Sequence, residues 1–160
     1  IILINLGGGN RWQYKKWTKE GYAGLINMLS TKYRKSGIAI IAGDEDRVFF
    51  EEILSLSAKN DNLINFGCDN STEDFICLVS LADKVFTSDS LCFHIAAALD
   101  KYTVVITGPT SHTELDVFSN GVILYSAKVD CLSCYLNTCD KTVTCMNTVT
   151  PEEIMKLIEA

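Results

Sequence analysis

Residues 84–99 read KVFTSDSLCFHIAAAL. This stretch predicts a short buried strand over 84–87 that runs through Ser88 and Asp89 into a helix over 90–99. The helix carries no polar stripe, so we expect it to be buried on all sides. Because the first amides of a helix have no partner within the helix, its start is a place where an anion can bind.

The same alternation of strand and helix extends along the whole chain. Apolar runs predict further strands over 2–6, 38–42, 63–66, 102–107 and 121–125. Spaced apolar residues predict helices over 19–34, around 48–56, from Ser71 onward and from Thr150 onward. Strands that alternate with helices require right-handed crossovers and a mainly parallel sheet. We therefore expect one α/β domain over residues 1–160, a Rossmann-like doubly wound sheet with helices on both faces.

Composition excludes several classes of protein. The chain has 160 residues, 48% of them hydrophobic and 21% charged, which is the balance of a folded domain rather than a disordered one. Its net charge of −6 argues against broad binding to nucleic acid or anionic membranes. No apolar run approaches the roughly 18 residues of a membrane-spanning helix. The seven cysteines favour a reducing, cytoplasmic compartment, and the start within a strand suggests a domain from a longer protein.

The loops that follow the strands contain similar types of residue. In such a sheet the ligand lies at the carboxyl ends of the strands, where the chain order reverses. Glycines, acidic residues and hydroxyls gather there, in Gly7-Gly8-Gly9 followed by Lys15 and Lys16, Gly43-Asp44-Glu45-Asp46, Gly67-Cys68-Asp69-Asn70, Ser88-Asp89-Ser90 and Gly108-Pro109-Thr110-Ser111. These residues predict a phosphate site, built from backbone amides and lysine. The alternative for each loop is that Ser88 or Asp89 merely caps its helix and the glycines merely form turns.

His94 lies about one turn into the helix of 90–99, on the same face as Ser90. A lone buried histidine is most often structural. Next to an anion site, however, it could donate a hydrogen bond to a phosphate or hold the preceding loop.

Several motifs together resemble glycosyltransferase family 9, the bacterial heptosyltransferases and their relatives. They are Lys15-Lys16-Trp17-Thr18 after a glycine loop, residues 88–98, and Thr107-Gly108-Pro109-Thr110. Residues 131–145, with Cys131, Cys134, Cys139 and Cys145, also resemble the cysteine pattern of that family. The motifs occur in order from the first strand to the final helix. Two departures are Thr18, where the family usually has proline, and Leu91, where many members have glycine.

The resemblance implies the carboxyl-terminal half of a GT-B glycosyltransferase, which binds the nucleotide-sugar donor. Lys15 would neutralise the donor diphosphate, and the amides of Ser90 and Leu91 would receive its oxygens. Asp89 and His94 would fix the loop or touch the donor, and Glu45 would bind the ribose hydroxyls; Gly8, Ser88, Gly108 and Thr110 complete the donor-binding set. The implied reaction moves a heptose-like sugar, with inversion, from an ADP-sugar to a lipopolysaccharide core-type acceptor.

In that family the catalytic base and the site for the lipid-linked saccharide acceptor are expected in an amino-terminal half, so no catalytic residue is assigned here. No cofactor is implied. The parent enzyme would work in the cytoplasm, at the inner face of the inner membrane. Oligomeric state is left open, and nucleic acid is not an expected partner.

The spacing Cys131-x2-Cys134-x4-Cys139-x5-Cys145 offers four thiolates within 15 residues. Four such ligands suffice for a tetrahedral structural zinc site. Paired cysteines and free thiols are the alternatives, and the spacing alone does not decide among the three.

Two other functional classes compete with the glycosyltransferase. One is a non-catalytic nucleotide- or partner-binding module with the same fold, since doubly wound domains carry many functions. The other is a dinucleotide-dependent dehydrogenase, which is disfavoured because Gly7-Gly8-Gly9 lacks the Gly-x-Gly-x-x-Gly spacing.

Overall fold

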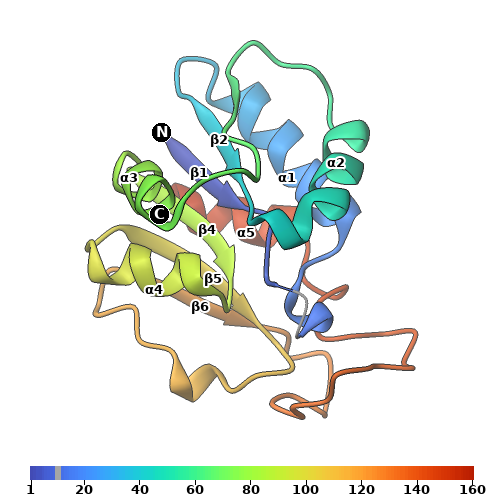
Figure 1. Cartoon of the computed structure of the whole chain (residues 1–160). Coiled ribbons are helices and arrows are strands. Elements are labelled where there is room, and N and C mark those ends of the chain that lie inside the picture. The colour runs from blue at the N-terminus through green and yellow to red at the C-terminus, as the bar shows by residue number, and fades with distance from the viewer. Residues whose placement is uncertain (10–11) are drawn as a thin grey trace.

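The computed structural model describes residues 1–9 and 12–160 and contains one six-stranded sheet. The strands are β1 (Ile2–Asn5), β2 (Ile38–Ile41), β3 (Leu63–Asn65), β4 (Lys84–Ser88), β5 (Tyr102–Thr107) and β6 (Gly121–Tyr125). Their order is β3-β2-β1-β4-β5-β6, and every pair of neighbours is parallel. The prediction of a doubly wound parallel sheet is confirmed, and the chain order reverses between β1 and β4 (Figure 1).

Within the described residues, five α-helices cover the two faces of the sheet (Figure 1). They are α1 (Lys19–Lys32), α2 (Arg47–Leu56), α3 (Thr72–Ser80), α4 (Leu91–Ala98) and α5 (Pro151–Glu159). Buried residues of α1, α2 and α5 pack with Ile4, Ile40 and Phe86 on one face. Buried residues of α3 and α4 pack with Leu3 and Val85 on the other face. Successive residues of a strand therefore belong to two separate hydrophobic cores, because side chains alternate between the two faces of a sheet.

Local sequence signals set the starts of three helices. Thr18 caps α1 by accepting from the Gly21 amide at 3.0 Å, and Ser71 caps α3 by accepting from the Asp74 amide at 3.1 Å. At α5, Thr150 and Glu153 form a complete capping box, with Pro151 in the first helical position. The predictions made for Ser71 and Thr150 are confirmed. No helix in the described ranges is both long enough and apolar enough to cross a membrane.

The prediction that the helix after β4 is buried on all sides is wrong. Cys92, Phe93 and Ala96 of α4 are buried, but His94 is exposed and Leu91 is 61% exposed. The error has a physical cause, since α4 is an outer-layer helix that packs on the sheet and α3 with one face only. Its apolar residues that are not fully buried are Leu91, Ile95, Ala97 and Ala98, and the alanines among them are tolerated at a helix surface because of their high helix propensity.

An aromatic cluster joins the motif of residues 15–18 to the sheet. Trp17 meets Tyr22 and Phe86 edge to face, with ring centroids 5.3 and 5.4 Å apart. The Trp17 indole Nε1 donates to the Val149 carbonyl at 3.1 Å, which satisfies its polar atom within the core. The cluster holds residues 15–18 against both the sheet and the segment before α5.

Phe86→Ala should lower the free energy of unfolding by about 3–5 kcal/mol, because it removes a fully buried ring from this cluster. Urea denaturation followed by circular dichroism measures the change. Val48→Ala, at a position 72% exposed, is the matched control and should cost less than about 0.5 kcal/mol. Equal effects of the two substitutions would contradict the assignment of Phe86 to the core.

Candidate functional site: a cavity at the start of helix α4

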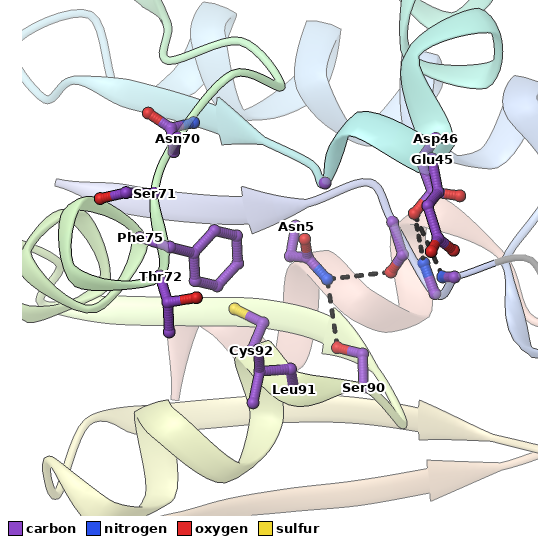
Figure 2. A pocket seen from close by; sticks show the side chains of 14 residues that line it. Asn5, Glu45, Asp46, Asn70, Ser71, Thr72, Phe75, Ser90, Leu91 and Cys92 are labelled. Atoms are coloured by element: carbon purple, nitrogen blue, oxygen red, sulfur yellow. Dashed lines mark hydrogen bonds between the residues drawn. The ribbon is translucent and has the colours of Figure 1, made fainter.

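A cavity of about 470 Å³ opens at the carboxyl ends of the strands (Figure 2). It is bounded by the loops after β1, β2 and β3 and by the first turn of α4. Its lining residues are Asn5, Gly7, Gly8, Gly9, Gly43, Glu45, Asp46, Asn70, Ser71, Thr72, Phe75, Ser90, Leu91 and Cys92. This is the edge of the sheet that the sequence indicated, and it lies beside the point where the strand order reverses. The volume is within the usual range for a small-molecule site.

Asp46 fixes the glycine loop that forms one wall of the cavity. Its Oδ2 accepts from the amides of Gly8 and Gly9, at 3.0 and 3.1 Å. Its Oδ1 forms an ion pair with Lys16, and its side chain is only 4% exposed. A Cβ at Gly7 would lie 2.4 Å from Asp46 Oδ2, so any larger residue there would displace the carboxylate.

Asn5 ties the same loop to the start of α4. Its Nδ2 lies 2.9 Å from the Gly7 carbonyl, 3.1 Å from Thr87 Oγ1 and 3.2 Å from Ser90 Oγ. Figure 2 shows the amide of Asn5 reaching Ser90 at the cavity wall. Because Asn5 is buried, these contacts bind β1 to β4 at the point of reversal.

The start of α4 has the geometry of an anion site. Ser90 stands at the N-cap, but its side chain does not cap the helix in the described part of the chain. Its Oγ contacts Asn5 and Thr87 instead, at 3.2 and 3.0 Å. Ser90, Leu91 and Cys92 all line the cavity, so the first turn of α4 faces it. The positive end of the helix dipole is thus directed at a space that could hold a phosphate.

Lys15 lies beside this helix start within a chain of polar contacts. Its Nζ is 2.7 Å from Asp89 Oδ2, and the Thr110 hydroxyl donates to the same oxygen at 2.6 Å. The side chains of Lys15 and Asp89 are 17% and 13% exposed. Thr107 Oγ1 in turn donates to the Thr110 carbonyl at 2.9 Å. Asp89 is therefore a partner of Lys15 and Thr110 rather than a helix cap.

The structure divides the predicted residues into three groups. Gly8, Glu45, Ser90 and Leu91 line the cavity, and Lys15, Asp89 and Thr110 form the adjoining polar chain. Ser88 and Gly108 lie behind them: Ser88 is fully buried, and a Cβ at Gly108 would lie 2.3 Å from Cys145 Sγ. The absence of a side chain at Gly108 is thus required for Cys145 to pack against it.

His94 does not line the cavity. It is exposed on α4, where its ring meets Phe93 at 5.0 Å between centroids. Its predicted burial was wrong because it rested on the expectation of a fully buried helix. Asn10, which the sequence places in the glycine loop, lies outside the described residues.

Three residues that organise the site were not among the predicted site residues. Asn5, Lys16 and Asp46 are all buried or nearly so, and each contacts a segment far away in sequence. A weak signal existed at Asn5, which is a polar residue in the middle of an apolar strand. Such a residue must find a partner when it is buried. Its partners depend on which strands become neighbours, so the pattern alone could not name them.

The four clustered cysteines do not form the zinc site that their spacing suggested. Across residues 1–9 and 12–160, no three histidine, cysteine or acidic side chains are grouped so that they could hold a metal. The thiols are unbonded and line a second cavity, of about 280 Å³, beside residues 13–18. Cys145 is held against Gly108, whereas Cys134 is exposed.

Asp46→Ala should lower the free energy of unfolding by about 3–5 kcal/mol, since it leaves Lys16 buried without its partner and frees the glycine loop. Urea denaturation provides the measurement, and Glu51→Ala on the exposed side of α2 is the control. Lys16→Met combined with Asp46→Ala should cost clearly less than the sum of the two single changes. A cost below about 1 kcal/mol for Asp46→Ala would show that the pair does not hold the loop.

Comparison with known proteins identifies relatives of the whole chain. Lipopolysaccharide heptosyltransferase 1 of Campylobacter coli is 25% identical over 163 residues, which span 99% of this chain and 45% of that protein. The fold is similar to that of E. coli ADP-heptose lipopolysaccharide heptosyltransferase II, with a TM-score of 0.78, 18% identity, and coverage of 99% of this chain and 45% of the other.

A second E. coli heptosyltransferase, solved with ADP-2-deoxy-2-fluoro heptose, gives a TM-score of 0.70 at 20% identity, over 99% of this chain and 42% of the other. The chain thus spans less than half the length of these relatives and has the fold of their carboxyl-terminal half. The sequence profile of glycosyltransferase family 9 (heptosyltransferase) matches residues 1–144, and the chain belongs to that family.

Proposed function

We propose that this chain is the donor-binding domain of an inverting glycosyltransferase, which transfers a heptose-like sugar from an ADP-sugar to a lipopolysaccharide core-type acceptor. The observation that carries the proposal is the cavity between the glycine loop and the first turn of α4, with Lys15 beside it. Membership of family 9 supports the class of reaction, and a related enzyme was solved with an ADP-heptose analogue.

In this proposal the diphosphate lies at the start of α4. The amides of Ser90 and Leu91 receive its oxygens, and Lys15 supplies a positive charge. Asp89, whose carboxylate accepts from the Thr110 hydroxyl, holds Lys15 in place, so the Lys15 ammonium is positioned before the donor arrives. When the bond from sugar to phosphate breaks, negative charge grows on the departing diphosphate. Positioned amides and a lysine stabilise that charge with little reorganisation, which lowers the barrier to transfer.

The nucleoside occupies the rest of the cavity. Glu45 is placed at its wall, where a carboxylate can accept hydrogen bonds from ribose hydroxyls. Phe75 adds an aromatic surface, and Asn70, Ser71 and Thr72 add polar groups along the same wall (Figure 2). An apolar surface with a few polar groups is the usual composition of a site for a nucleobase.

The remainder of the reaction is assigned to a preceding domain of the parent protein. That domain would supply the base that deprotonates the acceptor hydroxyl, together with the site for the lipid-linked saccharide. Residues 1–160 then bind and position the donor without supplying a catalytic base. We place the reaction on the cytoplasmic side of the membrane, where the acceptor lipid would present its saccharide.

Lys15→Ala should weaken binding of ADP by about 10- to 100-fold, because it removes a charge-assisted contact to the diphosphate and leaves Asp89 unpaired nearby. Binding of adenosine should change less than about twofold, because adenosine has no phosphate for Lys15 to contact. Isothermal titration calorimetry of both ligands makes the comparison, and Lys35→Ala at an exposed turn is the control.

Absence of measurable ADP and ADP-sugar binding to the unsubstituted chain would contradict the proposed function. Equal weakening of ADP and adenosine by Lys15→Ala would contradict the role of Lys15 alone.

A further inference from the structure

The cysteine segment, residues 131–145, packs against the loop that follows β5. Residues 132 and 133 form a turn between Cys131 and Cys134. The Ser133 amide donates to the Gly108 carbonyl at 2.9 Å, and the Tyr135 amide donates to the Pro109 carbonyl at 2.8 Å. Thr110, which follows directly, is the residue whose hydroxyl holds Asp89. The turn is therefore docked by two backbone hydrogen bonds onto the loop after β5.

The backbone of this turn is constrained. Ser133 and Tyr135 have φ angles of 57° and 53°, in the left-handed region that side chains other than glycine rarely adopt. Residues at the two ends of a tight turn have Cα atoms within about 7 Å of each other. A disulfide requires a Cα separation of about 4.4–6.8 Å. The turn thus places Cys131 and Cys134 at its two ends, where the Cα separation of a turn is compatible with a disulfide.

The four cysteines of the segment differ in their surroundings. Cys134 is exposed, and Cys131 is half-buried next to the Lys141 ammonium, whose pKa is raised by its contact with the Cys131 sulfur and then by Asp130. Burial raises the pKa of the Cys145 thiol to about 11, and the charges of Cys134 and Cys131 add to the effect. Cys145 therefore stays protonated at neutral pH and is a poor nucleophile, whereas Cys134 is accessible to an external reagent.

We propose that Cys131 and Cys134 form a reversible dithiol–disulfide pair that locks the turn beneath the donor-site loop. The oxidant is a low-molecular-weight disulfide. The Cys134 thiolate attacks one of its sulfurs, which breaks that S–S bond, forms a mixed disulfide and releases one small thiolate. The Cys131 thiolate then attacks the Cys134 sulfur and expels the second small thiolate. The two protons lost by the cysteines end on the two released thiols, so two electrons pass to the oxidant.

This pair gives the segment a role that does not depend on a metal. Ring closure fixes the turn that contains Ser133, whose amide holds the Gly108 carbonyl, whereas the reduced turn keeps only its hydrogen bonds. The inference stands apart from the proposed function, because it concerns a chemical change that can be measured without any donor.

The test is to equilibrate the chain under nitrogen in glutathione buffers, trap free thiols with iodoacetamide, and digest it with trypsin. Cleavage after Lys128 and Lys141 gives a fragment of residues 129–141 that contains Cys131, Cys134 and Cys139. In excess glutathione disulfide, Cys131 and Cys134 should escape alkylation, and this fragment should lose about 2 Da from the bond between them. Dithiothreitol should restore alkylation of both.

Variants identify the pair. Cys139→Ser and Cys145→Ser are the matched controls and should keep the loss of mass in residues 129–141. Cys131→Ser and Cys134→Ser should abolish it and leave glutathione attached to the remaining partner. The wild-type digest answers the question even if a variant fails to fold.

Three results would overturn the proposal. The first is full alkylation of Cys131 and Cys134 in excess glutathione disulfide. The second is a cross-link to Cys139, or one to Cys145 that joins residues 129–141 to residues 142–156. The third is one equivalent of zinc or iron in the purified chain that protects these thiols and disappears in Cys134→Ser.

Discussion

The carboxylate of Asp46 is the contact on which the geometry of the cavity at the start of α4 depends. It joins the loop after β2 to the glycine loop after β1 through two amides, and it neutralises Lys16 from the motif that precedes α1. Asn5 then connects that glycine loop to Ser90 at the start of α4. The side chains of Asp46 and Asn5 are both buried, so their contacts are part of the folded interior. These contacts fix the shape of the cavity before any ligand binds. A ligand entering this site meets amides that are already oriented.

The parallel sheet explains why these contacts can form. Every strand ends at the same edge, so residues separated by 38 positions (Gly8 and Asp46) or 82 positions (Asn5 and Thr87) become neighbours there. The reversal of chain order between β1 and β4 keeps the loop after β1 and the start of α4 from crossing over each other. The space between them is lined by glycines and by the first turn of a helix, which together are suited to an anion. Lys15, Asp89 and Thr110 extend this arrangement toward β5 and the cysteine segment.

The sequence was sufficient to predict the sheet, the capped helices at Ser71 and Thr150, and the edge that carries the cavity, because periodicity and caps are local signals. It was insufficient for α4, since an apolar helix in an outer layer has the same pattern as a fully buried one; His94 was misplaced for that reason. It also missed Asp46, Asn5 and Lys16, whose partners lie on other strands and loops.

The spacing of the cysteines was compatible with zinc, but in the structure the four thiols line a cavity, with a turn at residues 132–133 and with Cys145 packed on Gly108.

In the proposed function a diphosphate binds at the first turn of α4. The most direct measurement is a titration of isotopically labelled chain with ADP, in which the backbone amide resonances are followed by nuclear magnetic resonance. We expect the largest shifts at Ser90, Leu91 and Cys92 and smaller shifts at Gly8 and Gly9, and we expect inorganic pyrophosphate to reproduce the shifts in α4. Shifts confined to the cavity beside the cysteines, with the amides of α4 unchanged, would contradict it.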